Sequence, residues 1–268
     1  MEANKKIGFI GLGNMAAAMI GGMLQRGIIQ PENMIGSART AATCERMAEK
    51  YGITAYPSNV RVAEQADILF LAVKPQFFPE VIGEIRSSVR PETVIVSIAA
   101  GKTLEEIGRL FGGEKKLVRC MPNTPALGLE GCTGVCAGGG VSEAELAEIL
   151  ALLRCFGVAE VVPEQLMDTV VGVSGSSPAY VFMFLEAMAD GAVAAGMPRA
   201  QAYTFAAQAV LGSAKLMLET GRHPVELKDM VCSPGGTTIQ AVKVLEEKGL
   251  RAAVMDAMAA CIEKSKSL

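Results

Sequence analysis

The chain has 268 residues, of which 50% are hydrophobic and 20% charged, a balance that excludes a disordered chain and leaves room for two domains. The net charge of −3 argues against a nucleic-acid-binding surface, which is usually basic. Seven Cys is an odd number, and the first residues read as a strand rather than a secretory leader, so we expect a cytoplasmic protein without a disulfide framework.

The first two-thirds of the chain alternates short apolar runs with helical stretches. Strands are predicted at residues 6–10, 33–37, 68–73, 93–97 and 116–120, and helices at residues 16–26, 43–51, 79–88 and 103–111. The run at residues 68–73 is continuously apolar, which suits a parallel strand covered on both faces. Strands and helices that alternate in this way predict a doubly wound α/β sheet.

After about Pro163 the pattern changes to helices alone. The clear helices are at residues 179–195, 199–220, 238–248 and 250–265. Gly196, Gly221 and Gly249 lie where glycines commonly end helices. We therefore predict an α/β Rossmann-type N-terminal domain over residues 1–163, followed by an all-α C-terminal domain over residues 164–268.

A glycine-rich turn, Gly11-x-Gly13-x-x-Ala16, follows the first strand and opens the first helix. Gly11 allows the tight turn, Gly13 lets the backbone approach a pyrophosphate, and the helix N-terminus faces the phosphates. A glycine turn in a ligand-free α/β domain is the alternative, but the strand signals that follow favour dinucleotide binding. Cofactor contacts are therefore predicted for the turn residues Ile10, Gly11, Leu12, Gly13, Asn14 and Met15.

The end of the second strand carries Ser37 and Arg39, a hydroxyl and a guanidinium, but no acid. An NAD site needs Asp or Glu there for the ribose hydroxyls, and Glu32, which has the spacing, precedes the strand. The pair suits a 2′-phosphate instead, so NADPH is favoured over NADH. The alternative is that Arg39 is an ordinary solvated residue.

Two further strand ends fall at the carboxyl edge of the sheet, where ligands of α/β proteins bind. They carry Ala72, Val73, Lys74 and Pro75, and Ala99 and Ala100. Lys74 is either a phosphate contact or a solvated loop charge, and Pro75 at a helix start also has a structural explanation.

Two polar turns in the helical part place hydroxyls and backbone N–H groups at helix N-termini, which favours an anion such as a carboxylate. One is Ser-Gly-Ser-Ser-Pro at residues 174–178, and the other is Ser-Pro-Gly-Gly-Thr-Thr at residues 233–238, here named the 233–238 loop. Helix capping alone explains either turn, although the second holds more glycines and hydroxyls than capping needs.

The sequence has few residues that suit acid–base, nucleophilic or metal-dependent catalysis. The only His, His223, precedes Pro224 as an N-cap does, and no His/Cys cluster has metal-ligand spacing, so no metal is predicted. Cys132 and Cys136 read as small buried hydrophobes on a strand. A hydride transferase needs little more, because its cofactor carries the chemistry. A carbonyl acceptor needs an acid for the developing alkoxide, whereas an iminium acceptor does not, so the absence of such an acid points to a C=N substrate.

The 233–238 loop is followed by Ile239, Ala241 and Leu245, and this run of residues resembles the signature of the pyrroline-5-carboxylate reductase family. Further blocks match in order: Phe-Ile-Gly-Leu-Gly-Asn-Met at residues 9–15, Ala-Val-Lys-Pro at 72–75, Met-Pro-Asn-Thr-Pro at 121–125, and Ala-Tyr at 179–180.

The resemblance implies NADPH-dependent reduction of 1-pyrroline-5-carboxylate to L-proline, the last step of proline biosynthesis. It implies a small-molecule substrate, no nucleic acid or membrane partner, and a helical domain that interlocks with another subunit in a homodimer or a higher homo-oligomer. The substrate residues that it implies are Ser233, Pro234, Gly235, Gly236, Thr237 and Thr238, with the Thr238 hydroxyl near the ring nitrogen, and further Ser176 and Glu164. The additional cofactor residues that it implies are Asn59, near the adenosine, and Ile98, Ala99, Ala100, Asn123, Thr124 and Pro125.

Three positions depart from the family pattern. Ser177 stands where the family usually has Gly, and if that position needs a positive φ the serine weakens binding. Met230 stands where many members have Asn, and Gly221 where some members have an acid.

Two other functions stay open. A β-hydroxyacid dehydrogenase shares the Gly-Leu-Gly-x-Met start, but its catalytic lysine has only Lys215 as a candidate, with Glu219 where Asn is expected. A non-catalytic NADP-binding regulatory protein is the third interpretation, and the intact 233–238 loop argues against it.

The mean hydropathy is positive, +0.34, although the longest uncharged stretch, residues 169–185, is interrupted by Gly, Ser and Pro. The helix at residues 179–195 has only two charges, Glu186 and Asp190, so most of its surface must be buried. A helical domain of about 100 residues cannot bury several such helices alone. The apolar surplus therefore predicts a subunit interface.

Overall fold

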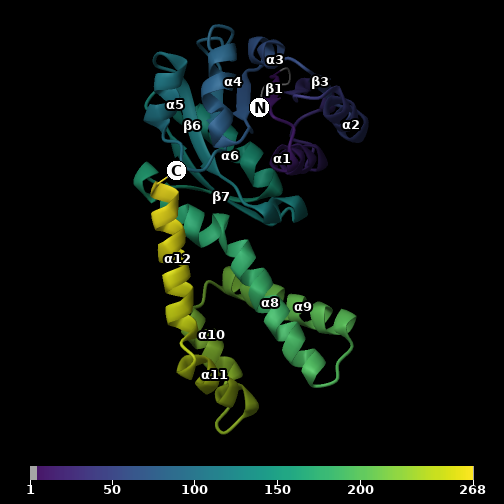
Figure 1. Ribbon diagram of the computed structural model, residues 1–268, viewed down its shortest axis with the longest axis vertical. Helices are drawn as coiled ribbons and strands as arrows, with labels where there is room; N and C mark the ends of the chain where they lie inside the picture. Colours follow the sequence, from purple (N-terminus) through teal and green to yellow (C-terminus); the bar gives the residue numbers. More distant parts are fainter. Residues whose placement is uncertain (1–4, 268) are drawn as a thin grey trace. The chain divides into compact units, whose positions relative to one another are not determined.

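The computed structural model describes residues 5–267, which form two compact units (Figure 1). The first unit holds the described residues up to Ser176 together with those from Cys261 onward, and the second is Ser177–Ala260. The predicted boundary between residues 163 and 164 stays a prediction. The compact units divide the chain a little later and return the last turns of the final helix to the first unit.

An eight-stranded sheet forms the centre of the first unit, in the order β3-β2-β1-β4-β5-β6-β7-β8. The strands are β1 (Ile7–Ile10), β2 (Met34–Ser37), β3 (Thr54–Tyr56), β4 (Ile68–Leu71), β5 (Val94–Ser97), β6 (Lys116–Met121), β7 (Gly131–Ala137) and β8 (Gly157–Val161). Only the β6–β7 pair is antiparallel. The carboxyl ends of β1 to β6 therefore meet at one edge.

Helices cover both faces of this sheet. They are α1 (Asn14–Gln25), α2 (Ala41–Tyr51), α3 (Asn59–Gln65), α4 (Phe78–Ile85), α5 (Leu104–Phe111), α6 (Glu143–Leu153) and the short α7 (Met167–Val170). Alternate strand residues point to opposite faces, so Phe9 packs with α1 and α6 whereas Ile10 packs with α3 and α4. The rings of Phe9 and Phe70 stack at 4.7 Å between centroids. Burial on both faces explains why these strands read as continuous apolar runs.

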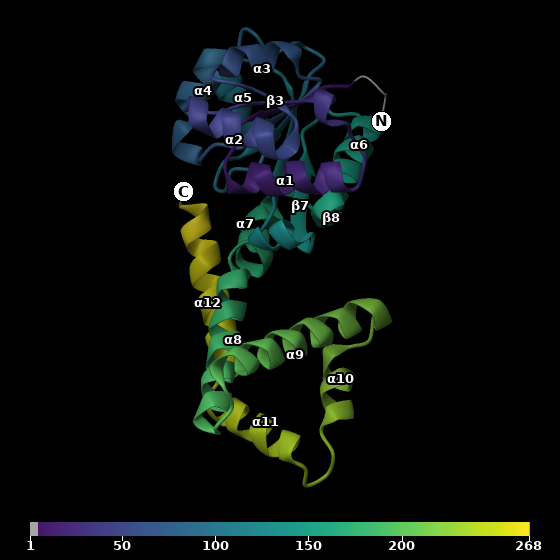
Figure 2. The same ribbon diagram turned by 90° about the vertical axis from the view of Figure 1, so that its right-hand side faces the viewer.

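The second unit is helical. Its elements are α8 (Ser177–Ala194), α9 (Arg199–Thr220), α10 (Pro224–Val231), α11 (Thr237–Glu247) and most of α12 (Leu250–Lys266). Helices α8 and α9 pack against each other (Figure 2) through small residues, since Ala189, Ala202 and Ala206 are the buried positions of the pair. The glycines that end helices behave as predicted: Gly196, Gly221 and Gly249 all have φ between 63° and 95°.

The apolar residues of these helices are largely exposed in a single chain. Phe182 and Met183 on α8 are 64% and 70% exposed, and Leu218 on α9 is 81% exposed. One helical run, Glu164–Ala194, is also long and apolar enough to cross a membrane by length and composition, which is weak evidence taken alone. The uncharged stretch that is interrupted in sequence thus lies inside a longer helix, because its glycines and serines are accommodated in helical backbone.

The predicted fold class, a Rossmann-type domain followed by helices, is confirmed. Sequence patterns missed β3, α3, α6 and β8, and for α10 they predicted only the N-cap at His223. The strand β3 and the helix α3 have three and seven residues, too few to show a period. Sequence patterns also missed a π-helical turn, Val171–Gly175, between α7 and α8.

Candidate functional site

The glycine-rich turn needs glycine at its first position for two reasons. Gly11 has φ +95°, and a Cβ there would lie 2.7 Å from the carbonyl oxygen of Ala72. Its N–H donates to the carbonyl of Ser37 at 3.0 Å, which fixes the turn against the end of β2. Gly13 differs, because a Cβ at that position would meet no heavy atom within 4 Å. Its face of the turn is therefore open to a ligand.

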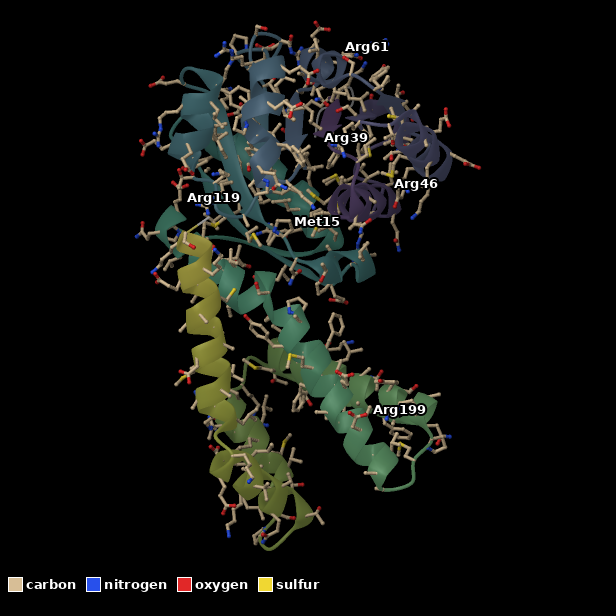
Figure 3. The ribbon with its side chains drawn as sticks, in the orientation of Figure 1. Met15, Arg39, Arg46, Arg61, Arg119 and Arg199 are labelled. Carbon is tan, nitrogen blue, oxygen red and sulfur yellow. The ribbon has the colours of Figure 1, made fainter. Side chains whose placement is uncertain are left out.

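Helix α1 starts at this open face without a side-chain cap. Its N-cap is Gly13, no acid lies in its first turn, and no side chain accepts a hydrogen bond from its first N–H groups. Such a helix N-terminus suits an anion. Asn14 is exposed and Met15 half-buried (Figure 3), whereas the side chains of Ile10 and Leu12 lie in the core, so those two offer a ligand their backbone alone. The turn therefore fits the pyrophosphate of a dinucleotide.

The end of β2 carries a short hydrogen-bond chain. Ser37 is fully buried, and its hydroxyl donates to Asn59 Oδ1 at 2.7 Å. Asn59 Nδ2 donates in turn to Glu84 Oε2 at 2.7 Å. Ser37 thus already has a partner inside the protein, whereas Arg39 is exposed, with its guanidinium 5.9 Å from the centre of the Phe77 ring (Figure 3). The contact of Arg39 with a 2′-phosphate stays a prediction.

The loops after β4 and β5 lie at the same edge as the glycine-rich turn. Ala72 N donates to the carbonyl of Ile10, and Ile98 N to that of Leu71, so both loops are tied to the sheet. In the first loop Ala72, Val73 and Pro75 are half-buried and Lys74 is exposed; in the second Ile98 and Ala100 are half-buried and Ala99 is buried. Lys74 has no ion pair among residues 5–267.

The loop after β6 is held by Asn123. This buried amide accepts a hydrogen bond from Cys132 N at 2.8 Å and donates to the carbonyl of Ser174 at 2.9 Å, so it joins β7 to the π-helical turn. The contacts of Asn123 within the protein are structural. The two residues that follow it are more accessible, since Thr124 is exposed and Pro125 is half-buried. The cofactor roles of these three residues stay predictions.

Glu164 is half-buried and has two partners within the first unit. Its Oε1 accepts from Leu104 N at 2.7 Å, where α5 begins, and lies 3.2 Å from Arg119 Nη1. Arg119 is a charged residue inside the apolar strand β6 and is almost fully buried (Figure 3). A buried guanidinium needs such a partner, so these contacts give Glu164 a structural role. Its place in the substrate pocket stays a prediction without support from them.

In the helical unit the 233–238 loop forms a turn that opens α11. Gly236 N donates to the carbonyl of Ser233, and Gly235 has φ +69°, which favours glycine. Gly236 is the N-cap of α11 and provides no side-chain acceptor. The first N–H groups of this helix, together with the Thr237 and Thr238 hydroxyls, have no hydrogen-bond partner in the described part of the chain. The turn therefore presents donors at a helix N-terminus, as a carboxylate site requires.

The other polar turn is shaped differently from the prediction. Its first part is the π-helical turn, in which Ser176 N donates to the carbonyl of Val171 at 2.8 Å. The Ser176 hydroxyl accepts from the Cys261 thiol at 3.1 Å. Ser177 is the first residue of α8, and Leu129 is the one non-glycine residue with positive φ among residues 5–267. Ser177 therefore fits its backbone without strain, and the concern about a missing glycine does not apply to φ.

The remaining candidate acids and ligands have structural partners. His223 caps α10 by accepting from Val225 N, and Lys215 lies exposed, 3.6 Å from Glu219. Cys136 lies on β7 as predicted, and burial raises the pKa of its thiol, with Glu164 adding to the rise. All seven Cys are free thiols, and no group of three metal-binding side chains occurs within residues 5–267.

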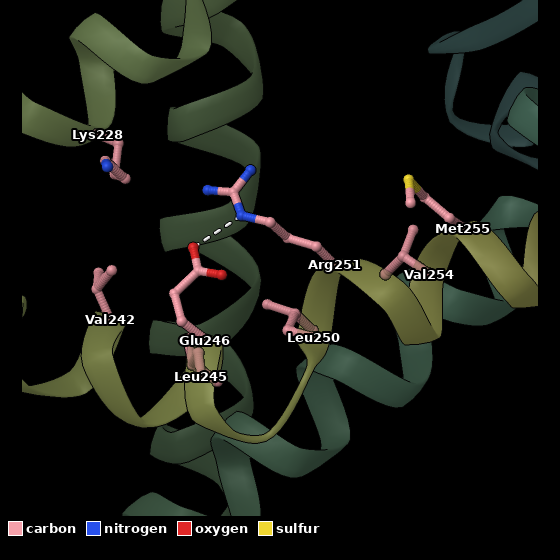
Figure 4. A pocket seen from close by; sticks show the side chains of 8 residues that line it. All are labelled: Lys228, Val242, Leu245, Glu246, Leu250, Arg251, Val254 and Met255. Carbon is pink, nitrogen blue, oxygen red and sulfur yellow. Dashed lines mark hydrogen bonds and ion pairs between the residues drawn. The ribbon is translucent and has the colours of Figure 1, made fainter.

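A mainly apolar hollow of about 540 Å³ lies among α10, α11 and α12 (Figure 4). It is lined by Val242, Leu245, Leu250 and Val254, and also by the ion pair of Arg251 Nε with Glu246 Oε1, which is 2.7 Å long. It has no titratable group other than Lys228, Glu246 and Arg251, so it resembles an uncovered core more than a catalytic pocket.

Sequence reasoning missed Glu84, Arg119 and the double role of Asn123. Arg119 gave a signal, because a charge inside an apolar strand requires a buried partner. Glu84 gave none, since an exposed acid on an amphipathic helix is ordinary.

Comparisons with known proteins agree along the whole chain. The profile of the pyrroline-5-carboxylate reductase dimerisation family matches residues 164–268, and that of coenzyme F420-dependent NADP oxidoreductases matches residues 6–101. Pyrroline-5-carboxylate reductase of Escherichia coli K12 is 55% identical over 264 residues, covering 98% of both chains, and that of Methanosarcina acetivorans is 44% identical, covering 99% and 98%.

Solved structures of the same kind superpose closely. A pyrroline-5-carboxylate reductase from Coxiella burnetii has a TM-score of 0.92 at 33% identity, covering 98% of both chains. Pyrroline carboxylate reductase of Plasmodium falciparum, solved with NADP bound, has a TM-score of 0.88 at 30% identity, covering 99% of this chain and 98% of that one.

Proposed function

The chain belongs to the pyrroline-5-carboxylate reductase family, and from that premise we propose how its residues serve the reaction. The enzyme reduces 1-pyrroline-5-carboxylate to L-proline with NADPH, the last step of proline biosynthesis. The observation that carries the site assignment is shared by the glycine-rich turn and the 233–238 loop: each opens a helix with a glycine N-cap, no side-chain cap and no acid in the first turn. These two turns offer backbone donors for the anionic groups that the two reactants carry.

The dinucleotide pyrophosphate binds at the glycine-rich turn. The uncapped N–H groups at the start of α1 donate to its oxygens, and the open face of Gly13 admits it closely. Asn59 and Arg39 serve the adenosine end, and Arg39 is the residue that favours a 2′-phosphate. The loops at residues 72–75 and 98–100 and the segment 123–125 border the nicotinamide end.

The substrate carboxylate binds at the 233–238 loop. The backbone N–H groups that open α11 are its donors, and positive φ at Gly235 shapes the turn that aims them. The Thr238 hydroxyl, free of partners among residues 5–267, accepts or donates at the ring nitrogen and orients the C=N bond. Bound NADPH supplies the hydride that reduces that bond. A substrate protonated as the iminium becomes a neutral amine on hydride addition, and a neutral imine takes one proton from solvent as the hydride adds, so no side-chain acid is required.

The helical unit mediates homo-oligomerisation. The match to a dimerisation family covers it, and the exposed apolar residues of α8 and α9 and the hollow of Figure 4 need a cover. We infer a homodimer, or a larger homo-oligomer built from dimers, in the cytoplasm. Light scattering after size-exclusion chromatography measures the oligomeric state directly, and a stable folded monomer at micromolar concentration contradicts the inferred dimer.

Substitution of Thr238 tests the substrate assignment. Thr238→Ala should lower kcat/KM for 1-pyrroline-5-carboxylate by about 10- to 100-fold, the effect of losing one hydrogen bond to a charged or developing-charge group. Thr238→Ser keeps the hydroxyl and should stay within about threefold of the parent enzyme. The Kd for NADP⁺, measured by calorimetry, should not change in either variant. Unaltered substrate kinetics in Thr238→Ala contradict the role given to this hydroxyl.

A further inference from the structure

We propose that Glu84 is a positioning residue of the dinucleotide site, which sets the orientation of the Asn59 amide and, through it, of the Ser37 hydroxyl. The inference rests on the proposed placement of the adenosine beside Asn59. Glu84 lies near the end of α4, and its carboxylate is exposed, so nothing in its own surroundings requires it to be there.

Three elements meet in this chain of hydrogen bonds. Ser37 ends β2, Asn59 starts α3, and Glu84 lies on α4. Both side-chain links measure 2.7 Å between heavy atoms. This length is ordinary for the hydroxyl donor of Ser37. It is short for the amide donor of Asn59, as expected when the acceptor is a carboxylate.

The carboxylate decides which way the amide faces. An ionised carboxylate only accepts hydrogen bonds, so the side of Asn59 that faces Glu84 must be the Nδ2 donor. Rotating the amide by half a turn would set Oδ1 against the carboxylate of Glu84, two acceptors in contact. With Nδ2 fixed, Oδ1 faces Ser37, and the Ser37 hydroxyl must donate its only proton to it.

The chain continues into the glycine-rich turn. The carbonyl of Ser37 accepts from Gly11 N at 3.0 Å, so Ser37 is held at its side chain by Asn59 and at its backbone by the turn. Asn59 is only half-buried and keeps one N–H and one lone pair beyond the two bonds described. These are the groups that it presents to the adenosine, in an orientation that Glu84 selects.

Two substitutions separate orientation from charge. Glu84→Ala removes the acceptor and the charge, whereas Glu84→Gln removes the charge but keeps an acceptor oxygen. Glu80→Ala is the matched control, because Glu80 lies one turn earlier on α4, is exposed, and has no hydrogen bond to Asn59. Calorimetric titration with NADP⁺ and with NAD⁺ gives Kd for each variant, and steady-state assays with NADPH give KM and kcat.

Glu84→Ala should raise the Kd of both dinucleotides by about 5- to 20-fold, because the Asn59 amide is no longer held in one orientation for the adenosine that both share. The KM for NADPH should rise in parallel while kcat stays within about twofold, since no reacting atom is touched. Glu84→Gln should recover most of the affinity, and Glu80→Ala should bind both dinucleotides as the parent enzyme does. Ser37→Ala combined with Glu84→Ala should cost less than the sum of the single changes, as both act through Asn59.

Other results overturn the proposal. If Glu84→Ala binds as Glu80→Ala does, the carboxylate orients nothing. If Glu84→Ala or Glu84→Gln gains affinity for NADP⁺ alone, Glu84 acts as a repelling charge near the 2′-phosphate and not through Asn59. By contrast, if the parent enzyme does not turn over pyrroline-5-carboxylate but the Kd differences among the variants are as expected, the proposed function is refuted and the role of Glu84 in dinucleotide binding is supported.

Discussion

The glycine-rich turn allows a sharp test, because its two glycines are required for different reasons. In Gly11→Ala the new methyl would lie 2.7 Å from the Ala72 carbonyl oxygen and 2.8 Å from Val73 Cγ1, at φ +95°. The backbone at Ala72 cannot yield easily, since its N–H is bonded to Ile10. Strain at this φ costs about 1–3 kcal/mol and the overpacking about 1–3 kcal/mol more, so we expect a loss of about 2–6 kcal/mol in the free energy of unfolding.

Gly13→Ala is the matched variant. Gly13 has φ −83° and ψ −169°, which alanine adopts, and a methyl there meets no atom within 4 Å. Its stability should fall by no more than about 1 kcal/mol, the cost of alanine at an N-cap. Its Kd for NADP⁺ should nevertheless rise by about tenfold or more, equivalent to about 1.4 kcal/mol, because the methyl occupies the face that meets the pyrophosphate.

Urea unfolding followed by circular dichroism, at one protein concentration for all variants, measures the first effect, and calorimetric titration with NADP⁺ measures the second. Equal stability of the two variants would refute the packing argument at Gly11. Wild-type affinity in Gly13→Ala would refute the placement of the pyrophosphate at this turn, whatever the result for Gly11.

Two further outcomes are expected. Asn123→Ala leaves the Cys132 N–H and the Ser174 carbonyl without partners, so urea unfolding should show a loss of about 2–5 kcal/mol, and a loss below about 1 kcal/mol contradicts the clamp. At Glu145 burial raises the pKa, but hydrogen bonds from Lys116 and Ser142 outweigh it and hold the pKa at about 2. A pKa below its ordinary value of 4.5 means that the stabilisation is complete above about pH 4.5 and is lost as the pH falls towards 2. Glu145→Gln keeps the capping box but has no charge to lose. The difference in Tm between this variant and the wild type should therefore become smaller as the pH is lowered from 4.5 to 2. A Tm difference that stays constant over this range contradicts the low pKa.

Much of the α/β fold could be predicted because its strands are buried on both faces. Continuous apolar runs such as Ile68–Leu71 and glycine stops such as Gly52 are local signals that need no knowledge of the partners. The short β3 and the antiparallel β7 gave weak signals, since three residues show no period and the sequence of β7 is rich in small residues. The π-helical turn gave no signal, although Gly175 in it lies close to the side chain of Met121, where a Cβ would be only 2.7 Å from Met121 Cε.

The sequence by itself determined the glycine-rich turn, the 233–238 loop and the apolar surplus of the helical part, and these were enough to indicate the family. Each is a contiguous segment whose chemistry depends on its own residues. Only the tertiary structure decided which polar groups are already engaged. Ser37 and Glu164 were both candidates for ligand contacts, and the fold turns the first towards Asn59 and the second towards Arg119. Glu84 entered the site in the same way, from 25 residues beyond Asn59, because the packing of α3 against α4 brings together side chains that no sequence spacing relates.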